Sequence, residues 1–468
     1  MEIVGECEYR GEAVLVTPSS ATPRRSLYLS NLDDQRFLRF SIKYLYVFPP
    51  SAAVAADALR AALARALVHY YPLAGRLRHH ADDKLVLDCN AEGALFAEAF
   101  LPTLTAADFL RAGATAKPHK SWRKLLYRVH AATFVAVPPL VVQVTQLGCG
   151  GMVVCTAISH CVCDGIATAN FLHAWAAFAA ADLDLAADRD DDLSVVLHDR
   201  RALRPRCPPR VAFTHPEYHT SSSSSSLLLI QPQLMPLAPV SLTFTAAHLR
   251  RLKARSLRSC TSFEALAAHV WRAWVLSLAP PPPPDMRVKL LFSVNVRRRL
   301  KPELPWTYCG NAFVLACAEA TPTELAAGAG VRLVQEAKDC IDDDYVRSTV
   351  DLLDQRRGAK PDLAATLVIS AWTRLGLEDV DFGKGRAAHM GPLTSEIYCV
   401  FLPVLADPNA VTVLLSLPQP AADTFEHHCC SCFLLDLDDD QPAVPVLVDK
   451  QDHDNQLVRA HHQHDILA

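Results

Sequence analysis

A strand, turn, strand, loop and helix between residues 140 and 178 constrain the fold more than any other feature of this sequence. Leu140–Leu147 is rich in valine and alternates apolar with polar side chains, which is typical of a strand. A second apolar run, Met152–Ser159, follows the glycine-rich turn at Gly148–Gly151. Apolar residues with helical spacing come next, at Ile166, Phe171, Trp175 and Phe178. We therefore predict a hairpin and a helix joined by a short polar loop around His160.

An earlier helix is expected to begin near Ser51. Leu59, Leu63 and Leu67 recur every four residues, which places them on one face of a helix. Ser51 follows two prolines and is of a residue type that caps helices. The helix should end near Tyr70–Pro72, because the residue before a proline avoids the helical conformation.

The second half of the chain also mixes helices and strands. Thr261 and Glu264 have the spacing of a capping box, so we expect a helix that begins there and ends before the proline run 280–284. Strand-like runs follow at Val288–Val294, Ala365–Ser370, Ile397–Leu402 and Ala410–Leu417. This pattern indicates two α/β domains.

A segment of low apolar content separates the two halves. It is rich in proline and arginine and contains an unbroken serine run at 221–226. We predict an N-terminal domain over residues 1–205, a crossover linker over 206–226 and a C-terminal domain over 227–435. Residues 436–468 are acidic and then His-rich, and we expect them to form a disordered tail.

Charge and composition exclude several classes of function. The 46 basic and 50 acidic residues nearly balance, without a long basic block, so nucleic acid is not an expected partner. The N-terminus lacks the basic start of a signal peptide, and no apolar run reaches the ~18–20 residues of a membrane helix, so we expect a cytoplasmic protein. Neither His427–Cys432 nor His461–His464 has the usual two-plus-two spacing of metal ligands, so we predict no metal site.

Three histidines have an aspartate four residues later: His79, His160 and His461. Only His160 lies at the end of an apolar strand, in a tight segment that includes Asp164 and is closed by Gly165. An imidazole with a pKa near ~6.5 can accept a proton from a hydroxyl or amine that attacks an acyl carbon. The alternative for His160 is a core histidine beside a structural aspartate.

Two other chemistries are weaker interpretations. Cys161 and Cys163 are poorly placed for deprotonation by a histidine of the same loop, which disfavours a Cys-His nucleophile. Asp381-Phe382-Gly383 lacks the glycine-rich and His-Arg-Asp loops of a kinase, which excludes that class.

Taken together, the segments resemble the BAHD family of plant acyl-CoA-dependent acyltransferases. Residues His160–Gly165 match the family's His-x-x-x-Asp-Gly signature, and Asp381–Gly385 stands where the family has Asp-Phe-Gly-Trp-Gly. Further segments match in order over roughly residues 1–435: Tyr71–Arg76, Ser262–Glu264 with His269–Trp271, Asn295–Leu300 and Tyr308–Asn311.

The resemblance implies two similar chloramphenicol-acetyltransferase-like α/β domains with mixed sheets and a channel at their interface. It also implies an acyl-CoA-dependent O-acyltransferase of plant specialised metabolism, a monomer without a cofactor. Acyl-CoA would be the co-substrate, and an acyl group such as acetyl or hydroxycinnamoyl would pass directly to an alcohol acceptor, with His160 as the general base. Transfer to an amine remains an alternative.

The resemblance also assigns roles to individual residues. His160, Asp164 and Asp381 belong to the catalytic motifs, with Asp164 mainly architectural and the Asp381 segment shaping the domain interface and the CoA end. The structural positions of these motifs are Gly165, Arg297, Phe382, Gly383 and Gly385, with Arg297 expected to pair with Asp164. The residues expected near CoA are Thr261, Ser262 and Lys384.

Two residues depart from the family pattern. Lys384 replaces the tryptophan of the second signature, and Asn295 stands where an aspartate commonly precedes the arginines. These changes leave open an alternative in which the chain is a non-catalytic homologue that acts as a binding or regulatory protein.

Overall fold

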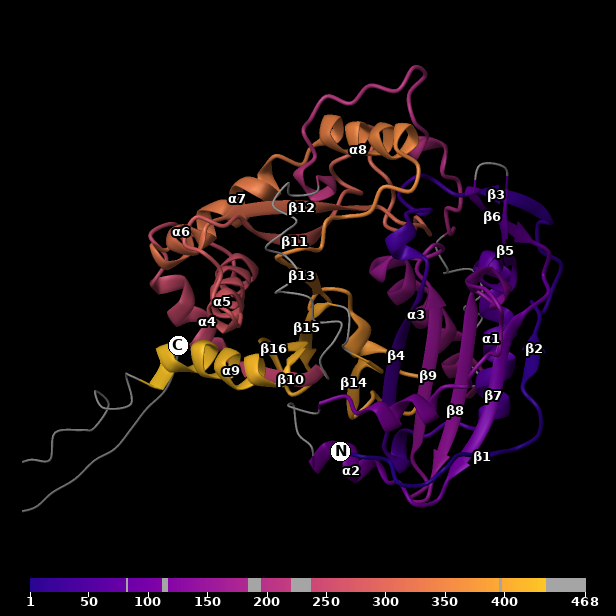
Figure 1. Ribbon diagram of the computed structural model, residues 1–468. Coiled ribbons are helices and arrows are strands. Elements are labelled where there is room, and N and C mark those ends of the chain that lie inside the picture. Colours follow the sequence, from indigo (N-terminus) through magenta and orange to yellow (C-terminus); the bar gives the residue numbers. More distant parts are fainter. Residues whose placement is uncertain (81–82, 112–116, 184–194, 220–236, 395–397, 435–468) are drawn as a thin grey trace, which may run out of the picture. The chain divides into compact units, whose positions relative to one another are not determined.

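The computed structural model describes residues 1–80, 83–111, 117–183, 195–219, 237–394 and 398–434. Met1–Cys429 form one compact unit. The fold is α/β, with two domains and mixed sheets, as expected (Figure 1). The serine run and the tail 436–468 lie outside the described residues, and the domain boundaries at 205 and 226 stay a prediction.

The first sheet has seven strands in the order β1-β7-β8-β9-β4-β14, with β2 also paired to β7. Only β7 and β8 run parallel. The bounds are β1 (Glu8–Tyr9), β2 (Val14–Val16), β4 (Ser41–Phe48), β7 (Ala94–Leu101), β8 (Leu140–Leu147), β9 (Met152–Ser159) and β14 (His389–Pro392). The predicted hairpin is therefore confirmed as β8 and β9. Strand β14 joins this sheet from the distant C-terminal half.

Helices α1 (Ala56–His69) and α3 (Gly165–Leu183) lie side by side against the first sheet (Figure 1). The predicted cap at Ser51 is wrong. Ser51 lies in a short 3-10 turn, Pro50–Ala52, and the N-cap of α1 is Ala55, which makes no side-chain capping bond. The helix ends before Tyr70, as predicted. A small third sheet is formed by β3 (Arg25–Tyr28), β5 (Arg76–His79) and β6 (Leu85–Cys89), and α2 spans Ala106–Arg111.

The second sheet has six strands in the order β10-β16-β15-β13-β11-β12. Strand β13 runs parallel to β11 and to β15, and the other pairs are antiparallel. The bounds are β10 (Leu237–Phe244), β11 (Val288–Asn295), β12 (Phe313–Ala320), β13 (Thr366–Ala371), β15 (Cys399–Val404) and β16 (Asp407–Pro418). The four strand-like runs predicted in this half are confirmed, with boundary shifts of a few residues.

The helices of the second half include α5, which begins at the predicted capping box. Thr261 Oγ1 accepts from the Glu264 N–H at 3.3 Å, and Glu264 Oε2 accepts from the Thr261 N–H at 2.8 Å. Helix α7 packs against α5 and β12. The bounds are α4 (Ala246–Ala254), α5 (Ser262–Ser277), α6 (Pro322–Ala326), α7 (Gly330–Asp339), α8 (Asp343–Gln355) and α9 (Gln419–Leu434). No helix among the described residues is both long and apolar enough to cross a membrane.

A continuous apolar core fixes the two elements that flank the His160 loop. Leu59, Leu63 and Leu67 of α1 are fully buried together with Phe171 and Trp175 of α3. The Trp175 indole N–H also donates to the Leu59 carbonyl at 2.9 Å. Each such side chain contributes about 1.5–3 kcal/mol by burial. Strand β9 and helix α3 are thus held firmly, and the loop between them has little freedom.

Candidate active site

His160 lies where β9 ends and faces a cavity of about 720 Å³. The His160 N–H donates to the Phe40 carbonyl at 2.9 Å, which fixes the start of the loop. The imidazole packs between two rings, with centroid distances of 5.5 Å to Phe40 and 5.7 Å to Phe313. The cavity is lined by residues of β4 from the first sheet and of β11, β12 and β13 from the second. His160 therefore stands at a cavity built by both sheets.

The Asp164 carboxylate is directed to Arg297 and to backbone groups. Arg297 Nη1 and Nη2 donate to Asp164 Oδ2 and Oδ1 at 2.7 and 3.0 Å, so the expected pairing is present. The Ala312 and Ala167 N–H groups donate to the same carboxylate at 3.1 and 2.9 Å, the latter at the start of α3. The side chains of Arg297 and Asp164 are 1% and 6% exposed, respectively. Because four N–H groups donate to its carboxylate, Asp164 anchors the loop to the start of α3 and to Arg297.

Burial controls the protonation of His160. It lowers the pKa of the imidazole below its usual value, while the Asp164 charge and Asn311 act in the opposite direction. A lowered pKa keeps the ring neutral at pH 7. A neutral imidazole can accept a proton, which is what a general base requires.

Gly165, the first residue of α3, allows close packing at the rim of the cavity. A Cβ at this position would come within 2.8 Å of Leu375 Cδ1, and both residues line the cavity. A larger residue at this position would displace the end of the Leu375 side chain.

The two cysteines of the loop do not line the cavity. Cys161 Sγ donates to the Leu38 carbonyl at 3.4 Å, and Cys163 Sγ lies 3.7 Å from Cys309 Sγ. All three thiols are buried, and burial raises the pKa of Cys161 above its usual value. The Cys-His nucleophile therefore receives no support from the geometry.

One part of the cavity wall carries charged and polar groups. It includes Thr261 at the N-cap of α5, Glu264, Arg299 and Lys338. Lys338 Nζ forms an ion pair with Glu264, and Arg299 Nη1 donates to the Lys338 carbonyl at 2.9 Å. Ser262, predicted near CoA with Thr261, does not belong to the lining.

The Asp381 segment forms a turn outside the cavity lining. Asp381 Oδ1 accepts from the Gly383 and Gly385 N–H groups at 2.8 Å each, and both glycines have positive φ (99° and 119°). The Phe382 ring is buried, with its centroid 4.9 Å from that of Trp175. Lys384 is exposed. The structure thus brings His160, Asp164, Gly165 and Arg297 together and places the Asp381 turn elsewhere.

Several cavity residues were missed by sequence reasoning. They are aromatic: Phe37, Phe40, Trp306, Trp372 and Tyr398. No local pattern marks them, because Phe37 and Phe40 share one short segment and the other three stand singly in distant segments. Only the tertiary fold brings them to one wall.

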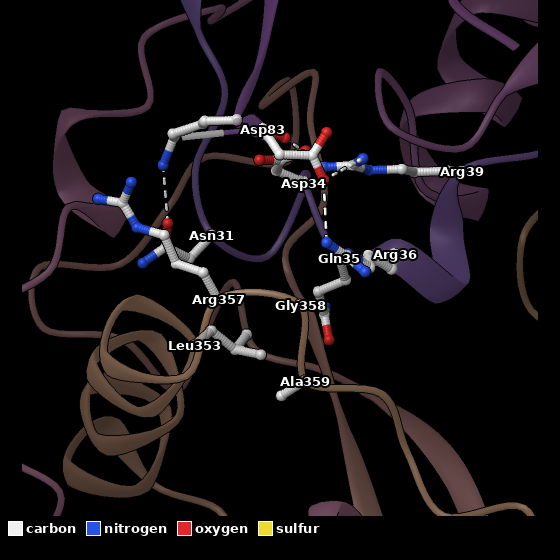
Figure 2. A pocket seen from close by; sticks show the side chains of 11 residues that line it. Asn31, Asp34, Gln35, Arg36, Arg39, Asp83, Leu353, Arg357, Gly358 and Ala359 are labelled. Atoms are coloured by element: carbon white, nitrogen blue, oxygen red, sulfur yellow. Dashed lines mark hydrogen bonds and ion pairs between the residues drawn. The ribbon is translucent and has the colours of Figure 1, made fainter. Parts of the chain in front are cut away.

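A second cavity, of about 50 Å³, is small and polar (Figure 2). The Asp83 carboxylate lies 3.0 Å from Arg36 Nη2 and 3.4 Å from Arg39 Nη1. His79, which shares the spacing of His160 to an aspartate, is half exposed beside Asp83 at 3.2 Å. The Asp83 carboxylate is exposed, so solvent screens these ion pairs. Of the two His-Asp spacings within the described residues, only that of His160 faces the large cavity, and His461 lies outside the described residues.

The sequence is similar to a set of plant acyltransferases over most of its length. A profile of the Transferase family matches residues 10–431. A fatty alcohol:caffeoyl-CoA acyltransferase of Arabidopsis thaliana is 35% identical over 427 residues, which cover 89% of this chain and 96% of the relative. An omega-hydroxypalmitate O-feruloyl transferase of the same plant is 34% identical, with 89% and 92% covered. A hydroxycinnamoyl-CoA:5-hydroxyanthranilate N-hydroxycinnamoyltransferase of Avena sativa is 33% identical, with 88% and 97% covered.

Solved structures share the fold. Vinorine synthase superposes with a TM-score of 0.69 at 19% identity, covering 91% of this chain and 98% of that one. F. graminearum TRI101 complexed with coenzyme A and deoxynivalenol gives a TM-score of 0.71 at 14% identity, with 85% and 96% covered. The chain therefore belongs to the Transferase family of plant BAHD acyltransferases, and it is an acyltransferase for groups other than amino-acyl groups.

Proposed function

We propose that the protein transfers an acyl group from an acyl-CoA thioester directly to an alcohol acceptor, with His160 as the general base. The observation that carries the proposal is that His160 faces the large cavity while Asp164 is committed to Arg297. The burial that lowers the His160 pKa supports a neutral imidazole at the working pH.

The reaction needs no covalent enzyme intermediate. His160 accepts the hydroxyl proton as the acceptor oxygen attacks the thioester carbonyl carbon, which gives a tetrahedral intermediate. The C–S bond then breaks, and the proton held by His160 passes to the CoA sulfur. The products are an ester and free CoA, and His160 returns to its neutral form.

We place the CoA phosphates at the charged part of the cavity wall. Thr261 stands at the N-terminus of α5, where backbone N–H groups and the helix dipole favour an anion. Arg299 adds positive charge beside it, while the charge of Lys338 is paired with that of Glu264. Lys384 does not line the cavity, so we propose that it contributes only weakly to CoA binding.

For the substrates, we propose a hydroxycinnamoyl donor and an apolar alcohol acceptor. Aromatic side chains such as Phe40, Trp372 and Tyr398 line the cavity, and about 720 Å³ falls in the usual range of roughly 300–1,000 Å³ for ligand sites. The relatives named for caffeoyl and feruloyl transfer support this choice. The Avena sativa relative is named for N-acylation, so an amine acceptor is the second candidate. We further propose that the enzyme is a cytoplasmic monomer that needs no cofactor beyond acyl-CoA.

The test is a purified-protein assay for release of the free CoA thiol, with products identified by mass spectrometry. Donors would be acetyl-, benzoyl-, caffeoyl- and feruloyl-CoA, and acceptors a fatty alcohol, an omega-hydroxy fatty acid, benzyl alcohol and an aromatic amine. We expect His160→Ala to reduce kcat by about 10²–10⁴-fold, the usual contribution of a general base.

His79→Ala is the matched control, because His79 has the same spacing to an aspartate but lies exposed at Asp83. It should keep wild-type turnover. Unchanged turnover in His160→Ala would refute the mechanism, and preferred transfer to the amine would replace O-acylation by the second candidate.

A further inference from the structure

A second buried carboxylate lies behind the His160 loop, on Asp33. Its Oδ2 accepts from the Ser30 N–H at 2.9 Å, from the Ser30 hydroxyl at 2.6 Å and from Arg200 Nε at 3.2 Å. Its Oδ1 accepts from the Asn311 backbone N–H at 2.7 Å and from Asn311 Nδ2 at 3.0 Å. The Asp33 and Arg200 side chains are both 0% exposed. Three segments far apart in the sequence thus meet at one carboxylate.

This cluster holds the His160 loop through backbone carbonyls. Asn311 Nδ2 donates to the His160 carbonyl at 2.7 Å as well as to Asp33. Arg200 Nη2 reaches the Val162 carbonyl at 3.5 Å. The loop is therefore held at residues 160 and 162 by one carboxylate system and at residue 164 by another, the Asp164–Arg297 pair.

The cluster also holds the Ser30 turn and, through Arg200 Nη1, the His198 carbonyl, so it ties these segments to the loop. Asp33, Arg200 and Asn311 do not line the large cavity, so they do not contact a substrate there. A fully buried ion pair is a weak source of stability compared with apolar residues of the same volume, because both charges lose their water. What such a network does supply is a single geometry for the groups that it contacts.

The neighbouring residue Asp34 provides a contrast. Its carboxylate pairs with Arg39 at 3.0 Å and accepts from the Leu85 N–H at 3.1 Å, on the side of the small polar cavity (Figure 2). Asp34 is also largely buried, with 11% of its side chain exposed. The two aspartates are therefore matched in type and sequence position, but the side-chain hydrogen bonds that reach the loop carbonyls, from Asn311 and Arg200, belong to the partners of Asp33.

We propose that Asp33 and Asn311 are positioning residues for His160 and form, with Arg200, a second clamp on the catalytic loop. The proposal adds positioning residues to the function proposed above. It rests on that function only for the kinetic test, which needs an active enzyme. Loss of the clamp displaces the His160 backbone and with it the imidazole. A displacement of about 1 Å from the reacting geometry can cost roughly 10²-fold in rate.

The kinetic test compares Asp33→Asn, Asn311→Asp, their double variant and Asp34→Asn. We expect each single variant at 33 or 311 to lower kcat at least about tenfold, with KM for acyl-CoA within about twofold, because the displaced group acts in catalysis and not in binding. Asp34→Asn should keep both parameters within about twofold, since its carboxylate bonds Arg39 and the Leu85 N–H and makes no hydrogen bond to the partners that hold the loop carbonyls.

The double variant tests whether the two residues act as one unit. Asn311→Asp alone sets a second carboxylate against Asp33, and Asp33→Asn removes that repulsion. The double variant should therefore lose less kcat than the product of the two single losses. If kcat of the double variant falls by the full product of the two single losses, the clamp is refuted.

Hydrogen exchange measured by mass spectrometry gives a readout that does not need activity. Amides of the loop are bonded within it, Val162 N–H to the Ser159 carbonyl at 3.0 Å among them. We expect faster exchange in the peptide covering residues 159–165 for Asp33→Asn and unchanged exchange for Asp34→Asn. Should Asp33→Asn not accumulate as folded protein, Asn311→Asp is measured in its place with the same expectation.

The two proposals fail in different ways. A wild-type protein that transfers no acyl group refutes the proposed function, while the exchange measurement still decides the clamp. An active wild type with wild-type kcat and unchanged exchange in the folded clamp variants refutes the clamp alone.

Discussion

Replacement of Arg297 by leucine is the perturbation whose effect the structure defines best. Arg297 is 1% exposed and donates two hydrogen bonds to Asp164 and one, at 3.0 Å, to the Tyr308 carbonyl. In Arg297→Leu the Asp164 carboxylate stays buried and keeps only its two backbone donors. Removal of one partner of a buried pair costs about 3–5 kcal/mol, because a buried charge is left uncompensated.

An exposed pair in the same chain gives the matched comparison. Arg332 lies 2.8 Å from Glu336, one helical turn away on α7, and these side chains are 45% and 54% exposed. A surface pair at this spacing contributes only about 0.3–0.5 kcal/mol. Arg332→Leu makes the same chemical change at an exposed position. The difference between the two variants in free energy of unfolding therefore reports the effect of burial.

The assay is urea unfolding followed by tryptophan fluorescence. With a slope of roughly 3 kcal/mol per molar urea, Arg297→Leu should lower the midpoint by about 1–1.7 M and Arg332→Leu by less than about 0.2 M. The double variant Asp164→Asn with Arg297→Leu should recover part of the loss, because it no longer buries an unpaired charge. Equal shifts in the two single variants, or no recovery in the double variant, would refute this reasoning.

Three further outcomes are expected. Since burial lowers the His160 pKa, kcat/KM should stay high as the pH falls through ~6.5 and be lost only below that value; an acid limb above ~6.5 would contradict a buried base. Gly165→Ala should displace the Leu375 side chain at the cavity and lower turnover with little loss of stability, because this side-chain end can move; Leu375→Ala should restore turnover in a double variant, and turnover and thermal unfolding measure the two effects. Lys384→Trp should change KM for acyl-CoA by no more than about twofold, because this exposed side chain does not line the cavity; a larger change in initial-rate measurements would give it a role in CoA binding.

Local signals in the sequence were enough for most elements of the fold. The reciprocal bonds of Thr261 and Glu264 set the start of α5, because a capping box is made entirely from neighbouring residues. The hairpin β8–β9 was predicted with its observed bounds, because its two apolar runs and the glycine-rich turn between them are also neighbours in the sequence. Ser51 misled the prediction, because the prolines before it form a separate 3-10 turn and α1 begins several residues later.

The site was predictable only in part. The family signature identified His160, Asp164 and Gly165, and the resemblance implied the Arg297 partner. The aromatic residues of the cavity and the contact of Asp33 with Asn311 have no local pattern in the sequence. Their members come from distant segments, which only the tertiary fold brings together. Asn311 stood within a matched segment, but its contact with His160 could not be seen in the sequence.

The pairing of β14 with β4 has a consequence for synthesis of the chain on the ribosome. Strand β4 is bordered by β9 on one side and by β14 on the other, and β14 lies at His389–Pro392. At roughly 5–20 residues per second, the edge of β4 stays without its second neighbour for roughly 17–70 seconds after it emerges. An uncovered edge of this kind is a template for aggregation. The nascent N-terminal half therefore carries an open sheet edge until β14 has been made.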